Sequence, residues 1–536
     1  MNQIKSLMNK YQIPAARPFI TAVLSVLLSG IFVIGSSIKN TYSLPKGIAS
    51  LLIFILLGIL FFVILNFLFI LLDKIKLKTP KKELKPFIVF FICLAFFMIF
   101  YFIQFLGFYP GLFVFDAPTQ CISYFNHNIS EHHPLLHTLL LAGIIDLFTD
   151  DFTSINHAVA LYTLIQITLC SISFSLYLAV IYGKIKSVLI TVLNLLFLTF
   201  FPPVVLLVMS ATKDTFFIIF FILSIAILFL LSDCDEKKAK LYIIPTALCV
   251  TLMTLFRNNC VYAVPFFFVP AVILLKKKRK QILIAAGIFA VLFVLYKTAF
   301  VPQIIAHKTD SREMMSVPIQ IAVKVYNDED AKISDESKAV IENLLEDYGL
   351  EYCPTIADLS KAALKNDYYE AHKSEVNKMF IKLAMNNPGK ALEAFLCLNC
   401  GLWYPNEVLT LYIGGAKGYW PVTCFSPAVI NPKIKAIYQF YVAFESAMAS
   451  GKYPVMTFIF NPGLYFCIFL VMSGYALEKK NSKLILFAPF ILVYFLTFLL
   501  GPVALVRYAL FLYVLFPIYF VEATGNNLGE IKNDDV

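Results

Sequence analysis

The chain alternates long apolar runs with shorter polar connections. Most of the runs are about 17–25 residues long, which is the length that crosses roughly 30 Å of hydrocarbon as an α-helix. Backbone polar groups in lipid have to be satisfied inside their own segment, so each run is expected to be helical. The pattern predicts twelve transmembrane spans, at 17–38, 47–73, 87–106, 157–180, 187–203, 213–232, 241–256, 260–275, 282–301, 455–476, 484–500 and 504–522.

The composition agrees with a membrane protein. Of the 536 residues, 60% are apolar and only 15% are charged, whereas a soluble chain carries about 25% charged residues. The predicted fold class is all-α: a polytopic transmembrane helical bundle of about 12 spans with a small helical extracytoplasmic domain.

The basic residues give the spans a direction. Lysine and arginine gather in four connections, which all fall on one side if the twelve spans alternate: 74–85, 184–186, 276–280 and 479–483. The positive-inside rule makes that side the cytoplasm. The expected location is therefore the cell membrane, multi-pass, with both termini cytoplasmic and any active site on the extracytoplasmic side.

Two segments on the outer side are too long to be simple turns. The outer loop 107–156 contains an apolar stretch, 134–148, that is too short to span and predicts an interfacial helix. The segment 302–453 has mixed charge and predicts helices at 334–348, capped by Ser334 or Asp335, and at 374–386. The expected organisation is an N-terminal transmembrane module with the outer loop (1–301), the extracytoplasmic domain with juxtamembrane segments (302–453), and C-terminal spans with a cytoplasmic tail (454–536).

The outer loop holds one carboxylate and three histidines just outside a predicted span. Asp116 suits a general base that accepts the proton of a hydroxyl, but it also suits the N-cap of a helix beginning near Pro118. His133 and His137 are four residues apart, a spacing that places two side chains on one helical face and suits a metal. The alternative is that Pro134 begins the helix and the histidines bond the loop backbone or lipid headgroups.

The charged residues at the outer ends of the spans point to an anionic ligand. Lys213 and Asp214 lie close to the hydrocarbon edge, where ionisable groups are often functional or simply reach into water. Arginine occurs only five times, yet Arg257 and Arg507 both lie at outer ends of spans. Because a guanidinium binds phosphate in a bidentate way, a lipid phosphate is the expected ligand. The alternative is a pair of structural salt bridges.

The order of these motifs resembles the C-type (GT-C) membrane glycosyltransferases, which include protein mannosyltransferases and aminoarabinose transferases. The motifs are an Asp in the first large outer loop, a His-Pro-Leu-Leu segment, a Lys-Asp pair at the next outer loop and an Arg-Tyr in the last span. Uncharacterised bacterial multi-pass proteins with Tyr-Pro-Gly, Asp, His-His-Pro and Thr-Lys-Asp in this order are the closest likeness.

This resemblance implies a polyprenyl-phosphate sugar as donor and transfer on the outer face. It implies that Asp116 is the catalytic carboxylate, Asp214 the second acidic position and Arg507 the late arginine. Two departures matter. Ala117 follows Asp116 where the family often pairs two acidic residues, which puts a metal-dependent version in doubt. The acidic loop also follows the third span instead of the first, as two extra N-terminal spans would explain.

The expected function is therefore transfer of a sugar to an envelope glycan, lipid or protein acceptor. The predicted catalytic residues are Asp116, His133 and Asp214, and the predicted substrate-binding residues are Arg257, Arg507, Lys213, His132, His137, Tyr508 and Glu313. No cofactor and no nucleic-acid partner is expected, and a divalent metal is left open. The alternatives are a flippase, transporter or polymerase of lipid-linked saccharides, or a non-catalytic scaffold in envelope assembly.

Overall fold

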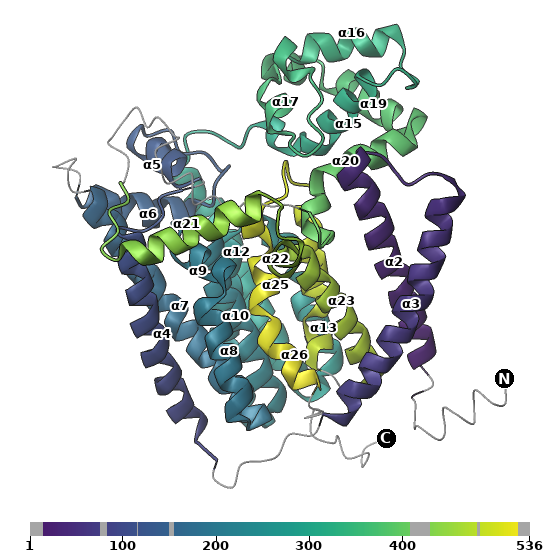
Figure 1. Ribbon diagram of the computed structural model, residues 1–536. Helices are drawn as coiled ribbons and strands as arrows, with labels where there is room; N and C mark the ends of the chain where they lie inside the picture. Colours follow the sequence, from purple (N-terminus) through teal and green to yellow (C-terminus); the bar gives the residue numbers. More distant parts are fainter. Residues whose placement is uncertain are drawn as a thin grey trace, which may run out of the picture.

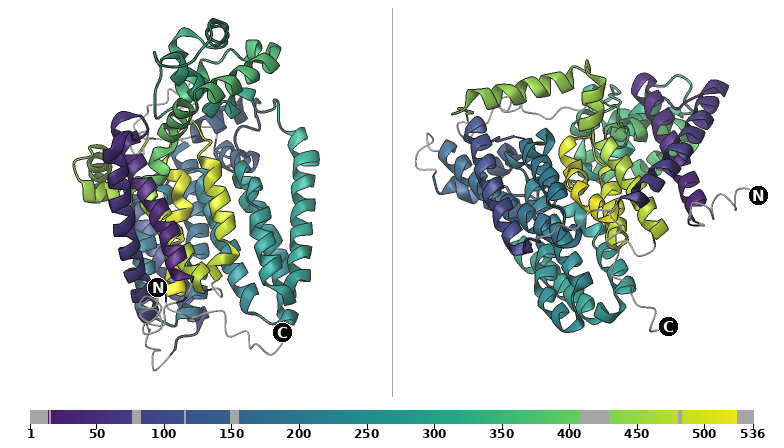
Figure 2. Two further views of the ribbon diagram at one scale, coloured as in Figure 1. Left: turned by 90° about the vertical axis from the view of Figure 1, so that its right-hand side faces the viewer. Right: turned by 60° about the horizontal axis from the view of Figure 1, so that its bottom comes forward.

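The fold is a bundle of long helices with a smaller helical domain at one end (Figures 1 and 2). The computed structural model describes residues 14, 16–75, 83–114, 116–148, 155–407, 429–479 and 483–523. Over these ranges the chain forms helices, and its extended contacts are isolated bridges. The predicted all-α class is confirmed at this level.

Seven stretches of the described chain are long and apolar enough to cross a membrane. They are α2 (Arg17–Thr41), α3 (Gly47–Lys74), α4 (Pro86–Phe108), α7 (Ile155–Ile185), α10 (Lys213–Asp233), Glu236–Phe256, which ends in α12 (Ile243–Phe256), and Lys276–Gln303, which contains α14 (Arg279–Leu295). Several long apolar helices of this kind confirm a helical membrane protein.

Two further predicted spans are bent helix pairs. α8 (Val188–Phe200) meets α9 (Pro202–Val208) at 58°, and α22 (Pro454–Phe460) meets α23 (Pro462–Lys479) at 56°, so the number of spans rises to nine if each pair is one span. A proline follows each break, and proline both lacks an N–H and clashes with the preceding turn.

The remaining predicted spans coincide with shorter apolar helices. The helices are α13 (Pro265–Leu274), α24 (Ala488–Phe498), α25 (Leu510–Val514) and α26 (Phe516–Ala523). The count of twelve stays a prediction.

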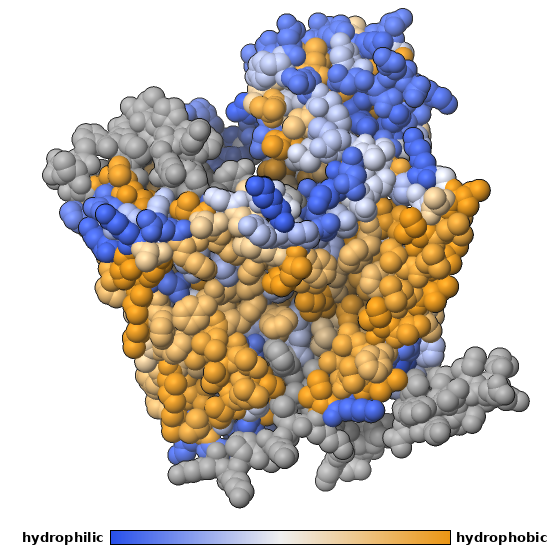
Figure 3. Space-filling view, viewed as in Figure 1, coloured by the Kyte–Doolittle hydropathy of each residue, from blue (hydrophilic) through white to orange (hydrophobic). Residues whose placement is uncertain are grey.

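Burial separates the central helix from the peripheral ones. In α10 the apolar window is 78% buried within the protein, whereas in α3 it is 6% buried. Hydrophobic side chains cover the middle of the face drawn in Figure 3, and hydrophilic ones gather toward its two ends. α10 is therefore packed on all sides, and its first residues lie where the bundle meets the polar end.

The domain at the polar end has a hydrophobic core of its own, built from residues between Met315 and Leu383. Its helices are α15 (Ser316–Tyr326), α16 (Asp335–Leu344), α17 (Asp358–Ala362), α18 (Asn366–Ala371) and α19 (Lys373–Asn386). Ser334 caps α16 by accepting a hydrogen bond from the Ser337 amide at 3.3 Å, as predicted. α16 stops at Leu344, short of the predicted end, because Leu345 forms a bridge with Leu364.

Two helices follow this domain in the chain and pack against the bundle. α20 (Pro388–Trp403) packs against α15 on the domain side and against α2 and α23 on the membrane side. α21 (Lys435–Ala449) packs against α4 and lies across the end of the bundle (Figure 1). The predicted segment 302–453 thus contains a compact domain followed by two helices that rest on the bundle.

A buried ion cluster holds the N-terminal hairpin α2–α3 to the bundle. Arg17, which is 1% exposed, pairs with Glu478 of α23 at 2.5 and 3.0 Å and with Asp73 of α3 at 2.5 Å. Tyr475 of α23 also donates to Asp73, at 2.9 Å. The guanidinium therefore joins the first residue of α2 to the last turns of α3 and α23.

We expect Arg17→Gln to destabilise the protein by about 3–5 kcal/mol, because it leaves the buried Glu478 carboxylate without its cation. A lowered midpoint of thermal unfolding in detergent is the measurement. Arg279→Gln is the matched control, since Arg279 is exposed and donates to the Val272 carbonyl at 3.1 Å. An equal decrease of the unfolding midpoint in both variants would contradict a stabilising role of the buried ion cluster.

Candidate functional site

Backbone pairing brings the outer loop against the start of α10. The Leu112 amide donates to the Met209 carbonyl at 2.9 Å, and the Ala211 amide donates to the Leu112 carbonyl at 2.8 Å. Gln166 of α7 holds the same turn by donating to the Val208 and Ser210 carbonyls, at 2.6 and 2.9 Å. The segments that precede Asp116 and Lys213 therefore run side by side.

Gly111 makes this approach possible. Its φ is +122°, and a Cβ on it would lie 2.1 Å from the Thr163 hydroxyl oxygen. Glycine alone combines the positive φ with the missing side chain that this packing needs. The loop thus passes close to α7 before it reaches Asp116.

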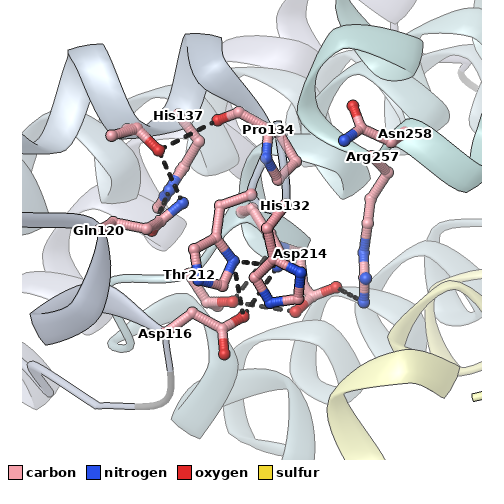
Figure 4. A network of polar contacts seen from close by, with 12 residues as sticks. Asp116, Gln120, His132, Pro134, His137, Thr212, Asp214, Arg257 and Asn258 are labelled. Carbon is pink, nitrogen blue, oxygen red and sulfur yellow. Dashed lines mark hydrogen bonds and ion pairs between the residues drawn. The ribbon is translucent and has the colours of Figure 1, made fainter. Parts of the chain in front are cut away.

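Five charged residues from four separate segments meet here, and we call them the ion network: Asp116, Lys213, Asp214, Arg257 and Arg507. Asp116 Oδ2 lies 2.8 Å from Lys213 Nζ and 3.0 Å from Arg507 Nη1. Arg507 Nη1 is also 3.7 Å from Asp214 Oδ2. Arg257 pairs with the other oxygen of Asp214, as Figure 4 shows. The sequence-predicted carboxylates, lysine and arginines are thus in one place.

The Asp116 side chain is not used as a helix cap. Asp116 occupies the N-cap position of α5 (Ala117–Phe125), but its carboxylate makes no capping hydrogen bond and points to the cations instead. At the start of α10 the capping is done by Thr212, which accepts from the Asp214 amide at 3.4 Å and donates to Asp214 Oδ2 at 2.9 Å. Of the two roles predicted for Asp116, the side-chain cap is not formed, and the role of general base stays a prediction.

Aromatic rings support the two guanidinium groups. Tyr508 lies 5.0 Å from the Arg257 guanidinium carbon and 5.2 Å from that of Arg507. Phe498 at the end of α24 lies 5.2 Å from Arg257 and stacks on Tyr508 with ring centroids 5.1 Å apart. These contacts attract the cations to the rings and hold both arginines, each only 8% exposed, in a fixed orientation.

The charges of the ion network do not cancel. Among the residues that the structure describes here, three cations face two carboxylates, which is one positive charge more than negative. Burial acts to raise the pKa of the Asp116 carboxyl, but the charges of Arg507 and Lys213 outweigh it and hold that pKa well below its usual range. Asp116 is therefore ionised in the free protein.

His133 extends the ion network as a neutral base. Its Nδ1 lies 3.2 Å from Lys213 Nζ and 4.0 Å from Asp116 Oδ2. Burial, with the charge of Lys213 second, holds the pKa of His133 well below its ordinary value. A neutral imidazole nitrogen can accept a hydrogen bond from the Lys213 ammonium group, so His133 adds a polar contact and no charge.

His132 and Glu313 form a separate contact beside the ion network. His132 is exposed, and its Nδ1 is 3.5 Å from Glu313 Oε2. Lys361 of the small domain also reaches Glu313, at 2.9 Å. Through Glu313, these two contacts join the outer loop to the small domain.

His137 lies apart from the network. α6 (Leu135–Asp146) matches the predicted interfacial stretch, and it begins after Pro134, so His133 is in the preceding loop. His133 and His137 therefore do not share a helical face, and the alternative prediction that Pro134 begins the helix is confirmed. The buried His137 bonds Gln120 at 2.9 Å and Tyr162 at 2.8 Å instead. Across the described ranges, no three His, Cys, Asp or Glu side chains are grouped so that they could hold a metal ion.

The sequence did not point to several residues that position the site. Gln166 and Thr212 are ordinary polar residues in apolar surroundings, and Phe498 is one of 53 phenylalanines. A Gln within an otherwise apolar run was the one available signal, because a buried amide needs hydrogen-bond partners.

The fold and the ion network define a helical membrane protein with a charged cluster at one end of its bundle. The chain belongs to a family of unknown function, DUF6020, whose model matches residues 126–535. That match includes the predicted site residues from His132 to Tyr508, whereas Asp116 and the α2–α3 hairpin precede it. No curated protein and no solved structure matches the chain.

His137 makes a pH-dependent contribution to stability that can be measured. Burial lowers its pKa to about 3, while the unfolded imidazole takes up a proton near pH 6.5. The unfolded state therefore binds more protons between these values, and stability should fall by about 1.4 kcal/mol per pH unit as the pH drops through this window.

Unfolding midpoints between pH 7 and pH 4.5 test this expectation. His137→Gln should show a shallower loss of stability with falling pH than the wild type. His157→Gln replaces an exposed histidine and is the control that should keep the wild-type slope. Parallel curves for all three proteins would refute a neutral, buried His137.

Proposed function

We propose that this protein is a membrane glycosyltransferase that moves a sugar from a polyprenyl-phosphate donor to an acceptor on the outer face of the membrane. The observation that carries the proposal is the ion network, in which buried cations exceed carboxylates by one charge at the end of apolar helices. A lipid-linked phosphate presents its charge at that depth, where arginine binds it in a bidentate way.

The size of the excess favours one phosphate over two. A phosphodiester that links a prenyl chain to a sugar carries a single negative charge, which balances the one surplus positive charge of the network. A diphosphate carries more than the network offsets. Charge balance therefore favours a donor with one phosphate, held by Arg257, Arg507 and Lys213.

An apolar groove beside the network suits the chain of such a donor. It has a volume of about 430 Å³ and lies between α2, α20 and α24. Leu496 and Leu499 line it, while Phe498 on another face of the same helix contacts Arg257. Asn399 at the groove donates to the Leu499 carbonyl at 3.1 Å. The C-terminal end of α24 therefore lies between the groove and the cations of the ion network.

These positions support the following reaction. The acceptor hydroxyl attacks the anomeric carbon, the bond from that carbon to the phosphate oxygen breaks, and prenyl phosphate leaves. Asp116 takes the proton of the hydroxyl, and the guanidinium groups stabilise the charge that grows on the phosphate. His133 orients the acceptor, and the small domain with Glu313 and His132 covers the approach.

The donor also makes Asp116 a better base. In the free protein Arg507 and Lys213 hold the Asp116 pKa low. Phosphate oxygens compete for these same cations, which weakens their hold on the carboxylate and raises its affinity for a proton. The donor thus prepares the base for the step that follows.

The direct test supplies purified protein with radiolabelled polyprenyl-phosphate monosaccharides and follows the label into water-soluble or acceptor-linked product. Asp116→Asn should lower the rate by roughly 100-fold or more, because the amide cannot take the proton. Arg257→Lys keeps the positive charge but loses the bidentate guanidinium, and should lower the transfer rate roughly 100-fold. Arg279→Lys, at the opposite end of the bundle, is the control and should keep full activity.

The rival functions give different results in the same experiment. A flippase would move labelled lipid between leaflets of liposomes without forming product, and a polymerase would yield products of increasing length. Full activity in a protein that lacks both Asp116 and Arg257 would overturn the proposed mechanism.

The groove can be filled without disturbing the fold. Gly30 lines the groove, and a Cβ built on it meets no atom within 4 Å. We expect Gly30→Leu to raise the KM for the prenyl-phosphate donor about tenfold with little change in kcat, because the added side chain occupies space for the donor chain. Gly287→Leu is the matched control, since Gly287 also lies in a helix with open space at its Cβ. Unchanged KM in Gly30→Leu would exclude this groove as the chain site.

A further inference from the structure

The helix α21 has a surface that the proposed transferase site does not use. It lies across the end of the bundle on the side of the small domain, and the hydrophobic band of the bundle begins directly below its level (Figures 1 and 3). It packs against α4, one of the helices long enough to span the membrane. A helix in this place runs along the level at which lipid gives way to water.

One stripe of α21 is buried against the bundle. Tyr441, Phe444 and Met448 are 5%, 7% and 3% exposed. The Tyr441 ring centroid lies 5.1 Å from that of Phe108 in α4, and the Phe444 centroid lies 4.8 Å from that of Phe460 in α22. This spacing along the sequence places the three side chains on one helical face, which holds α21 in a fixed rotation about its own axis.

That rotation turns an apolar flank outward. At about 3.6 residues per turn, Ala436, Phe440, Ala443 and Ala447 lie together along one side of the buried stripe. Phe440 is 60% exposed, and Ala436 and Ala443 are exposed as well. The flank therefore presents one large aromatic ring among small apolar side chains.

The face of α21 opposite the buried stripe is polar. Lys435, Gln439 and Ser446 lie on it, and all three are exposed. The helix thus has a stripe for the bundle, an apolar flank and a polar face. Helices with an apolar side and a polar side of this kind lie in the plane of a membrane surface.

The charge of the segment suits a lipid surface. Residues 429–453 contain three lysines, at positions 433, 435 and 452, and one glutamate. Lys433 Nζ lies 4.7 Å from the centre of the Tyr109 ring, at the end of α4. Basic side chains close to a membrane are attracted to the phosphate groups of its lipids. Lysines beside an apolar flank therefore match phosphates above acyl chains.

Backbone hydrogen bonds connect α21 to the beginning of the outer loop. The Asn431 amide donates to the Tyr109 carbonyl at 2.8 Å, and the Lys433 amide donates to the Leu106 carbonyl at 2.7 Å. The chain continues from Tyr109 to Asp116. The depth of α21 in the membrane surface and the depth of the outer loop are therefore linked.

We propose that α21 is an interfacial helix that binds the surface of the lipid bilayer on the side of the small domain. The Phe440 flank lies at the boundary between headgroups and acyl chains, and Lys433 and Lys435 contact lipid phosphates. Lipid is the occupant because the flank continues the lipid-facing surface of α4, whose apolar window is only 22% buried within the protein. This proposal is independent of the transferase function.

Fluorescence quenching in nanodiscs of phosphatidylcholine and phosphatidylglycerol tests the proposal on the full-length protein. Phe440→Cys carries an environment-sensitive fluorophore, and the quenchers are doxyl-labelled lipid and aqueous iodide. Doxyl lipid should quench this probe about twofold more strongly than a probe on the polar face, since the apolar side of such a helix lies roughly 5–10 Å deep. The unsubstituted protein, whose described cysteines are buried or partly buried, gives the labelling background.

Gln439→Cys is the matched control. Gln439 is the neighbouring residue and is also exposed, but it lies on the polar face. Its probe should be quenched more by iodide and less by doxyl lipid than the probe in Phe440→Cys. Equal quenching of the two probes by either agent would overturn the proposal. A Phe440→Cys probe that neither quencher reaches would also overturn it, and would indicate a protein partner on this flank.

Discussion

Arg507 places a constraint on much of the structure. A guanidinium that is 8% exposed at the edge of an apolar bundle is stable only with carboxylates beside it. Its partners are Asp116 and Asp214, which are 391 and 293 positions away along the chain, and Asp214 is shared with Arg257. Apolar packing alone has no direction, so these ion pairs decide which ends of α5, α10, α12 and α25 meet.

The same reasoning explains how α10 is held. The helix has 21 residues, which corresponds to roughly 31 Å at 1.5 Å per residue and matches the hydrocarbon thickness. Lys213 and Asp214 lie at its first turn within the ion network, and Asp233 at its last residue pairs with Lys483. A shift along the helix axis would draw charges into lipid at one end, so the ion pairs at its two ends fix the helix in depth as well as in orientation.

Local patterns were sufficient for the elements but not for their contacts. Apolar length predicted the long helices, and Ser334 predicted the start of α16. The bends before Pro202 and Pro462 were not predicted, although proline explains them. For the site, the rarity of arginine and the depth of Lys213 indicated the right residues. The role of Asp116 could not be decided locally, because an aspartate suits both a helix cap and a general base at that position. Its carboxylate contacts Lys213 and the distant Arg507 and does not cap the helix, and the local sequence does not show these long-range contacts.

His137 shows the opposite case, in which a chemically suggestive residue is structural. The four-residue spacing suggested a helical face shared with His133, and the alternative was that Pro134 begins the helix. The helix does begin after Pro134, so the two histidines lie on different segments. The imidazole instead satisfies Gln120 and Tyr162 between α5, α6 and α7. The residue type therefore indicates that His137 makes polar contacts, while the long-range contacts determine that these are structural hydrogen bonds.

Charge balance connects the resting ion network to the proposed reaction. With a phosphodiester donor in place, the one surplus positive charge of the network and the one negative charge of the donor cancel. As the bond to the sugar breaks, the phosphate gains a second negative charge, and Asp116 loses its own by taking the acceptor proton. The total charge in the buried site is the same before and after the step. A low-dielectric site opposes any change in net charge, so pairing proton transfer with phosphate release is the arrangement that lets buried arginines and the partly buried Asp116 act together.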